Sequence, residues 1–175
     1  MGIKLDQGFS QELVSELDQE LGSKLGGFAP DLYLETRMDS IDQEMLEAAK
    51  IALSSAYAPY SSFLVGAAIL GSDNKIYSGC NVENAAYPLG NCAETSAIAA
   101  MVSGGCTTIK RILTIGSGHE AVTPCGGCRQ RLREFSSHET PVICVGIEEK
   151  SEPLFTTIEQ LLPNSFGPRF LKVDK

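Results

Sequence analysis

The chain has 175 residues, six cysteines and a formal net charge of −8. A chain of this length forms one domain with at most a short addition, and it can bury a core without disulfide staples. The acidic balance disfavours nucleic acid as a partner, because binding to phosphates depends mainly on Lys and Arg.

The composition and the net charge also predict the cellular compartment of the protein and the kind of ligand that it binds. We expect neither a signal peptide nor a membrane span, because no apolar run is long enough to cross a bilayer. Cysteines in a chain of ordinary apolar content then indicate a reducing compartment, which predicts a cytoplasmic protein. A small, neutral ligand suits the acidic balance better than a polyanion does.

Residues 1–37 are predicted to be an N-terminal extension that contains one amphipathic helix. Ser10 can cap this helix, and its leucines recur at helical spacing, at Leu13, Leu17 and Leu21. The glycines and the proline between Gly22 and Pro30 end it. The expected role of this helix is packing, either on its own domain or on a neighbouring subunit.

The main domain, residues 38–175, is expected to open with a helix and a hairpin. Ser40-Ile41-Asp42-Gln43 has the pattern of a capping box, and Pro59 should stop the helix that follows. Residues 63–70 form a nearly continuous apolar run, which is typical of a strand covered on both faces. Gly71-Ser72-Asp73-Asn74 then turns the chain into a second strand, residues 75–80.

The rest of the domain alternates between helices and strands. The expected elements are a helix over 92–102, a strand over 109–116, a helix over 125–135 and a strand over 141–147. Such an order after an opening hairpin predicts a mixed sheet with helices on both faces. The expected fold is therefore a three-layer α/β/α sandwich with a mixed sheet of about five strands.

Two segments of the chain together have the spacing of a catalytic zinc centre. Asn91-Cys92-Ala93-Glu94 and Pro124-Cys125-Gly126-Gly127-Cys128 match the signature of zinc deaminases of nucleobases, which allows Cys as the first ligand. Cys92, Cys125 and Cys128 would supply three thiolates and leave the fourth position of the metal to water. Glu94 follows the first ligand closely enough to reach that water.

Two other interpretations of these cysteines remain open. A structural zinc site normally takes four ligands, but Cys80, Cys106 and Cys144 stand singly in the sequence. A redox dithiol would leave Cys92 and Glu94 unexplained. The predicted ligands also begin two helices, so backbone N–H groups and positive dipole ends should face the thiolates and lower their pKa.

With these residues in hand, the sequence resembles the cytidine deaminase family, in the three-cysteine form that is typically a homotetramer. The matching motifs follow the family's order across about residues 40–171. They are Ala58-Pro59-Tyr60-Ser61 with Phe63 and Val65-Gly66-Ala67-Ala68, Gly79-Cys80-Asn81-Val82-Glu83-Asn84-Ala85-Ala86-Tyr87, Cys92-Ala93-Glu94, Pro124-Cys125-Gly126-Gly127-Cys128-Arg129-Gln130, and Leu161-Leu162-Pro163 with Phe166-Gly167-Pro168.

The resemblance implies an activity and roles for individual residues. The implied reaction is zinc-dependent hydrolytic deamination of cytidine and deoxycytidine in pyrimidine salvage, with Glu94 as the proton shuttle. Asn81 and Glu83 would bind the ribose 3′-hydroxyl. Phe63 would lie against the pyrimidine.

Four more residues take roles from the resemblance. The Ala93 backbone would hold the pyrimidine edge, and the Thr123 carbonyl would lie near the leaving amine. Phe166 and Tyr87 would reach the active site of a neighbouring subunit, so the implied assembly is a homotetramer with shared sites. Phe63 and Phe166 could instead be core residues, and Asn81 an ordinary turn residue.

The sequence departs from the family at Thr95. The family commonly has Arg there, hydrogen-bonded to the zinc thiolates. Either the zinc-bound water is less acidic in this protein, or another cation supplies the missing positive charge, and we expect the second, with Arg129 beside Cys128 as that cation. The departure keeps open a deaminase of aminoacyl-nucleoside antibiotics of the blasticidin type. A nucleic-acid base editor and a non-catalytic, zinc-stabilised scaffold are the alternatives from other classes.

Overall fold

The computed structural model describes residues 38–148 and 151–171. The helix expected within residues 1–37 lies outside these ranges, so the N-terminal extension stays a prediction. The described elements, in chain order, are helix α3 (Ser40–Ser54), strands β1 (Val65–Gly71) and β2 (Ile76–Cys80), the 3-10 turn η1 (Tyr87–Leu89), helix α4 (Ala93–Ser103), strand β3 (Ile109–Gly116), helix α5 (Gly126–Phe135), strands β4 (Pro141–Gly146) and β5 (Leu154–Thr157), helix α6 (Ile158–Leu161) and the 3-10 turn η2 (Pro168–Phe170).

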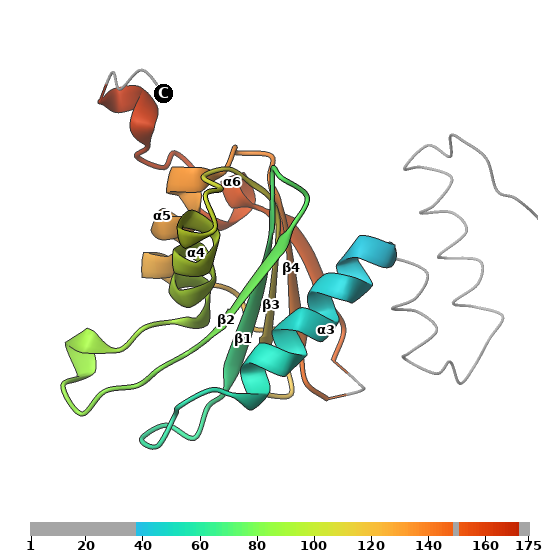
Figure 1. Ribbon diagram of the computed structural model, residues 1–175, viewed down its shortest axis with the longest axis vertical. Coiled ribbons are helices and arrows are strands. Elements are labelled where there is room, and N and C mark those ends of the chain that lie inside the picture. Colours follow the sequence, from blue (N-terminus) through green and yellow to red (C-terminus); the bar gives the residue numbers. More distant parts are fainter. Residues whose placement is uncertain (1–37, 149–150, 172–175) are drawn as a thin grey trace, which may run out of the picture.

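One five-stranded sheet forms the middle layer of the fold. The strand order is β2-β1-β3-β4-β5, in which β3 and β4 pair in parallel and the other neighbours pair antiparallel. Helix α3 covers one face, while α4 and α5 cover the other (Figure 1). This arrangement confirms the predicted three-layer sandwich with a mixed sheet.

The two faces of the sheet bury separate apolar clusters. Along β1, Ala67 and Ile69 belong to the cluster under α4, and Ala68 belongs to the cluster under α3. Successive side chains of a strand point to opposite faces, so a strand buried on both sides has no polar positions to alternate with apolar ones. This double burial explains the continuous apolar run in the sequence.

Two glycines allow the helices to lie close to the sheet. A Cβ atom on Gly66 would lie 2.0 Å from the Ala49 carbonyl oxygen of α3. A Cβ atom on Gly79 would lie 2.5 Å from the Ala97 backbone nitrogen of α4. Any larger residue would push a helix away, so Gly79 helps to fix where α4, and with it Cys92 at its start, lies on the sheet.

The start and the end of the first helix correct the sequence analysis. Asp39, not Ser40, is the N-cap: its Oδ1 accepts a hydrogen bond from the Asp42 backbone at 2.9 Å, and Asp42 Oδ2 accepts one from the Asp39 backbone at 3.2 Å. Arg111 lies 2.8 Å from Asp39 and 2.6 Å from Asp42, and this contact favours the one-residue shift. The helix already ends at Ser54, well before Pro59.

No helix within residues 38–148 and 151–171 is long and apolar enough to cross a membrane.

Candidate active site

Three thiols meet where two helices begin. Cys92 is the N-cap of α4, Cys125 is the N-cap of α5, and Cys128 lies in the first turn of α5. Their sulfur atoms all lie within 4.8 Å of one another, and the Cys92 and Cys125 sulfurs are 3.9 Å apart. Tetrahedral zinc with Zn–S bonds of about 2.3 Å separates two sulfurs by about 3.8 Å, so the three thiols fit zinc.

Glu94 lies directly against this cluster. It is the second residue of α4, only 4% of it is exposed, and its Oε2 accepts a hydrogen bond from the Cys128 thiol at 3.2 Å. A buried carboxylate is costly without partners. A position beside a thiol and in the first turn of a helix reduces that cost, because the helix N-terminus favours negative charge.

The thiols differ in how readily they ionise. Burial, followed by the Glu94 charge, raises the pKa of Cys128 far above its usual range. Burial also raises the pKa of Cys92, to which the charges of Cys125 and Glu94 add. Burial opposes ionisation of Cys125 as well, but hydrogen bonds from the Cys128 backbone and thiol outweigh it and lower the Cys125 pKa. Three adjacent thiols can all be deprotonated together only with a cation among them, which again fits a metal site.

Thr95 is partly exposed, but its hydroxyl oxygen is buried and has no hydrogen-bond partner. Of the side chains in the described part of the chain, its Oγ1 is the buried polar atom that has no hydrogen bond. Thr95 is the third residue of α4, so it shares a helix face with the N-cap Cys92. The residue that departs from the family pattern therefore also has an unused hydrogen-bond donor, three positions along α4 from Cys92.

Arg129 holds the segment that carries the second and third cysteines. Its Nε donates to the Pro124 carbonyl at 2.7 Å, and its Nη2 donates to Thr123 Oγ1 at 3.2 Å. Its Nη1 donates to the Leu161 carbonyl at 2.9 Å. All three acceptors are oxygens, so Arg129 links the segment before Cys125 to α6. Its expected role in balancing the thiolate charge stays a prediction.

A cavity of about 330 Å³ opens above the thiols and unites most of the predicted residues. Its lining includes Glu94, two of the thiols and five of the seven residues expected to bind substrate. The full lining is Val65, Asn81, Val82, Glu83, Tyr87, Gly90, Asn91, Cys92, Ala93, Glu94, Val122, Thr123 and Cys125. Val65 and Val122 are apolar walls that sequence reasoning did not single out, because a valine that lines a cavity has the same signal as one in the core.

The loop before β1 is fixed by residues of the segment after β2. Asn81 accepts a hydrogen bond from the Val65 backbone at 2.8 Å and donates to the Phe63 carbonyl at 2.9 Å. Phe63 itself is 39% exposed and lies beside Gly116 and Gly118 rather than in the lining of the cavity. The structure thus brings Asn81 to the cavity and leaves the Phe63 ring at its side.

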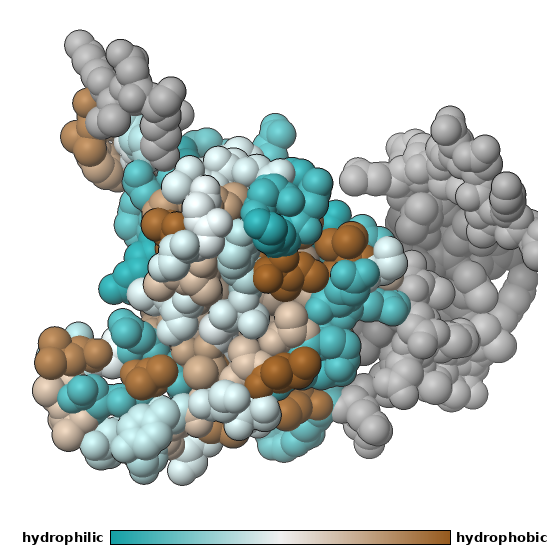
Figure 2. All heavy atoms as spheres, viewed as in Figure 1, coloured by the Kyte–Doolittle hydropathy of each residue, from teal (hydrophilic) through white to brown (hydrophobic). Residues whose placement is uncertain are grey.

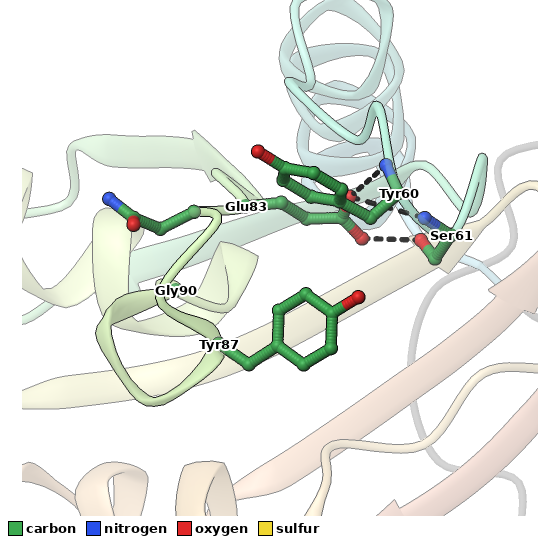
Figure 3. A pocket seen from close by; sticks show the side chains of 6 residues that line it. Tyr60, Ser61, Glu83, Tyr87 and Gly90 are labelled. Carbon is green, nitrogen blue, oxygen red and sulfur yellow. Dashed lines mark hydrogen bonds between the residues drawn. The ribbon is translucent and has the colours of Figure 1, made fainter.

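A second cavity, of about 340 Å³, adjoins the first and shares Glu83, Tyr87 and Gly90 with it. The rings of Tyr60 and Tyr87 meet edge to face there, with centroids 5.8 Å apart. Figure 3 shows the Glu83 carboxylate turned toward the segment of Tyr60 and Ser61, with Tyr87 beside it.

Phe166 lies outside both cavities. It is 56% exposed and stacks on Phe170, with ring centroids 5.3 Å apart. Gln130 donates to the Phe166 carbonyl at 3.0 Å, and the buried Arg133 donates to Ser165 Oγ at 3.0 Å. These contacts hold the start of the C-terminal segment on α5, an arrangement that no local sequence pattern signals.

Comparisons with known proteins point in one direction. Residues 39–150 match the family described as "Cytidine and deoxycytidylate deaminase zinc-binding region". A cytidine deaminase of Sporosarcina psychrophila is 40% identical over 71% of this chain and 90% of its own length, and one of Mycobacterium tuberculosis is 37% identical over 74% and 93%. The crystal structure of cytidine deaminase from Burkholderia pseudomallei superposes with a TM-score of 0.67 at 38% identity, covering 74% of this chain and all of that one.

Proposed function

Because the chain belongs to the cytidine deaminase family, with its zinc-binding region, we propose that it converts cytidine and deoxycytidine into uridine and deoxyuridine. Water adds at C4 of the cytosine ring, the bond from C4 to the amino nitrogen breaks, and ammonia leaves. The reaction belongs to pyrimidine salvage. We place it in the cytoplasm, since all six cysteines are free thiols and a reducing compartment keeps them so.

The observation that carries this proposal is the buried Glu94 carboxylate beside three thiols in a cavity of ligand size. Cavities that bind small molecules usually have volumes of about 300 to 1,000 Å³, and about 330 Å³ is available here. A purely structural metal site does not need a carboxylate that is only 4% exposed beside the metal ligands. A reaction that transfers protons needs such a group.

Cys92, Cys125 and Cys128 would hold the zinc ion. When bound, zinc supplies an acidified water molecule as the nucleophile and leaves the fourth coordination position open for it. A thiolate cannot donate a hydrogen bond, so deprotonated Cys128 would no longer occupy Glu94 Oε2.

Glu94 then carries protons between water and the cytosine ring. It takes a proton from the attacking water and delivers it to ring N3 as the new C4–O bond forms. It next transfers the second proton of that water to the amino nitrogen, which leaves as ammonia. General acid-base transfer of this kind contributes about a hundred- to ten-thousand-fold in rate.

The lining of the cavity suits a neutral nucleoside. Among the described residues that line it there is no Lys, Arg or His, so a substrate phosphate would find no cation. We assign the sugar 3′-hydroxyl to Asn81 and Glu83, the pyrimidine edge to the Ala93 backbone, and the leaving amine to the Thr123 carbonyl. Recognition of the 3′-hydroxyl alone lets ribose and deoxyribose enter equally.

The proposed assembly is a homotetramer whose active sites are shared. Phe166 and Phe170 form an exposed aromatic pair on the C-terminal segment, which projects from the body of the domain (Figures 1 and 2). An apolar pair on a projecting segment is suited to a neighbouring subunit, and Phe166 does not line the cavity of its own chain. We assign Phe166 and Tyr87 to a neighbour's site, and the Phe63 ring to the pyrimidine once that site is closed.

Ammonia release from cytidine, deoxycytidine, cytosine, CMP and blasticidin S tests the proposed function. We expect turnover of the first two by the protein with one zinc per chain, as measured by metal analysis. Turnover of blasticidin S alone would assign the chain to the antibiotic deaminases. A protein that contains zinc but releases no ammonia from any of the five compounds would be a non-catalytic, zinc-stabilised scaffold. A mobility shift with single-stranded nucleic acid would favour a base editor.

A further inference from the structure

The hydroxyl of Ser61 joins two residues that flank the cavity. Its Oγ donates to Glu83 Oε1 at 2.5 Å and accepts a hydrogen bond from the Phe63 backbone at 3.0 Å (Figure 3). The direction is fixed by chemistry, since an amide nitrogen can only donate and a carboxylate can only accept. Ser61 thus uses its hydroxyl both as a donor, to Glu83, and as an acceptor, from Phe63.

The loop before β1 fills most of the acceptor positions of the Glu83 carboxylate. Glu83 Oε2 accepts hydrogen bonds from the Tyr60 backbone at 2.8 Å and from the Ser61 backbone at 3.2 Å. A carboxylate offers about four acceptor positions, two on each oxygen. Three of them are taken by the loop, and the fourth lies on Oε1, the oxygen that Ser61 also binds.

The loop also keeps Glu83 ionised. The Ser61 hydroxyl, with the Tyr60 backbone second, holds the pKa of Glu83 below its usual range. Near neutral pH the carboxylate is thus an acceptor only, and it can bind a hydroxyl but cannot donate to one.

We propose that Ser61 is a positioning residue, which fixes Glu83 so that one acceptor position on Oε1 remains for the sugar 3′-hydroxyl and so sets the preference of the enzyme for substrates that carry it. This inference rests on the proposed function, in which Glu83 binds that hydroxyl. Without the Ser61 hydroxyl, Oε1 would have two open positions and water would fill the second. The carboxylate would then lose its fixed orientation, and the Phe63 backbone would lose its tether.

The test compares two substrates that differ only in the hydroxyl at issue, deoxycytidine and 2′,3′-dideoxycytidine. The measured quantity is the ratio of their kcat/KM values. We expect the parent to prefer deoxycytidine, and Ser61→Ala to reduce this preference about tenfold or more, because hydrogen bonds to charged groups contribute at about that level. The loss should appear in KM for deoxycytidine, with kcat changed little.

Three further variants serve as controls and replicates. Ser61→Thr keeps the hydroxyl and should restore most of the preference. Ser61→Cys keeps the volume with a weak donor and should behave as Ser61→Ala does, so the result does not depend on one variant folding. Ser54→Ala makes the same substitution on the exposed end of α3, where the hydroxyl donates to the Ile51 carbonyl of its own helix, and should leave the ratio unchanged.

Equal losses on both substrates in Ser61→Ala and Ser61→Cys would reduce Ser61 to a structural role and overturn the inference. A parent enzyme that deaminates both substrates equally well would overturn it too, while leaving the proposed function intact. If the zinc-loaded parent deaminates no cytosine nucleoside, the proposed function itself fails. The two failures are therefore distinguishable.

Discussion

Glu94 combines two properties at the scale of a single residue: it is buried, and it accepts a hydrogen bond from Cys128, one of the three proposed zinc ligands. Glu94→Gln keeps the shape of the side chain, so we expect the fold and the zinc content to persist. A carboxamide cannot carry protons, so kcat should fall about a hundred- to ten-thousand-fold. Metal analysis and steady-state kinetics on cytidine measure both quantities, and a variant within tenfold of the parent would exclude Glu94 as the shuttle.

The unpartnered hydroxyl of Thr95 gives a prediction with opposite signs in two states of the protein. Thr95→Val replaces the hydroxyl by a methyl group of similar size. Without metal, removal of a buried, unsatisfied group should raise stability by about 1 kcal/mol or more. With metal, the variant should bind zinc more weakly, because Thr95 can donate to the Cys92 thiolate one turn away and valine cannot.

Thermal melts of the chelated protein and competition for zinc with a chelator check the two signs separately. Thr95→Ser, which keeps the donor, is the matched control and should retain the zinc affinity of the parent. A Thr95→Val variant with unchanged zinc affinity would mean that the hydroxyl does not serve the thiolates.

Which residues could be predicted from the sequence depends on how locally they are specified. The cluster of three cysteines and Glu94 follows from short spacings, because two helix starts carry these residues. The Ser61–Glu83 contact and the Arg129 contact with Leu161 join residues that are 22 and 32 positions apart, and no periodicity encodes such a meeting. The N-cap was placed one residue late for the same reason, since both Asp39 and Ser40 can cap and a distant Arg111 favours Asp39.

At the scale of elements, the start of α3 depends on an ion pair with β3. Arg111 binds Asp39, which is half-exposed, and Asp42, whose side chain is 7% exposed. Arg111→Met would leave the Asp42 carboxylate buried and unpaired. We expect the free energy of unfolding at pH 7 to fall by about 3 kcal/mol, most of it from Asp42.

This loss should depend on pH in a defined direction. The Arg111 hydrogen bond holds the pKa of Asp39 below its ordinary value of 3.8. A lowered pKa in the folded state contributes stability above the ordinary value, and this stability disappears as the pH falls through the folded-state value. Urea unfolding should therefore show a smaller difference between Arg111→Met and the parent below about pH 4 than at pH 7.

Asp39→Asn is the control for this prediction. Asparagine still caps a helix, but it has no charge for Arg111, so the loss at pH 7 should be smaller than that of Arg111→Met. A difference between Arg111→Met and the parent that is constant from pH 7 to below pH 4 would contradict the assigned role of the ion pair.

The elements that the sequence did not indicate are the short ones. Strand β5 and helix α6 have four residues each, too few for a visible period. Backbone hydrogen bonds to the turn before β4 fix this region, from Ile158 to the Thr140 carbonyl at 3.1 Å and from Glu159 to the His138 carbonyl at 2.9 Å. The longer elements were predicted to within about two residues at their strand and helix ends, apart from the end of α3.

At the scale of the whole molecule, the site exists because β3 and β4 run parallel. Helix α4 precedes β3 and α5 precedes β4, so the parallel pair carries both helices in the same sense across one face. Their N-termini then meet, and the cysteines meet with them. The sequence predicted each helix start, but only the pairing of the strands brings the two starts together.

The last prediction concerns the assembly. If Phe166 covers the cavity of a neighbouring subunit, Phe166→Ala should raise KM for cytidine and leave zinc content unchanged. Mixing two variants then tests whether a neighbouring subunit completes each site. Subunits with Glu94→Gln are inactive but keep Phe166, and subunits with Phe166→Ala keep Glu94. After joint unfolding and refolding with zinc, mixed tetramers should contain sites that combine both intact residues.

These combined sites should bind cytidine with the low KM of the parent, so the mixture should show a low-KM fraction that neither variant shows alone. Refolding each variant separately and combining the two afterwards is the control, and it should not produce that fraction. Sedimentation of the parent should give four chains per particle. A fully active monomer, or a refolded mixture that only averages the two variants, would mean that each chain completes its own site and that the projecting aromatic pair serves some other contact.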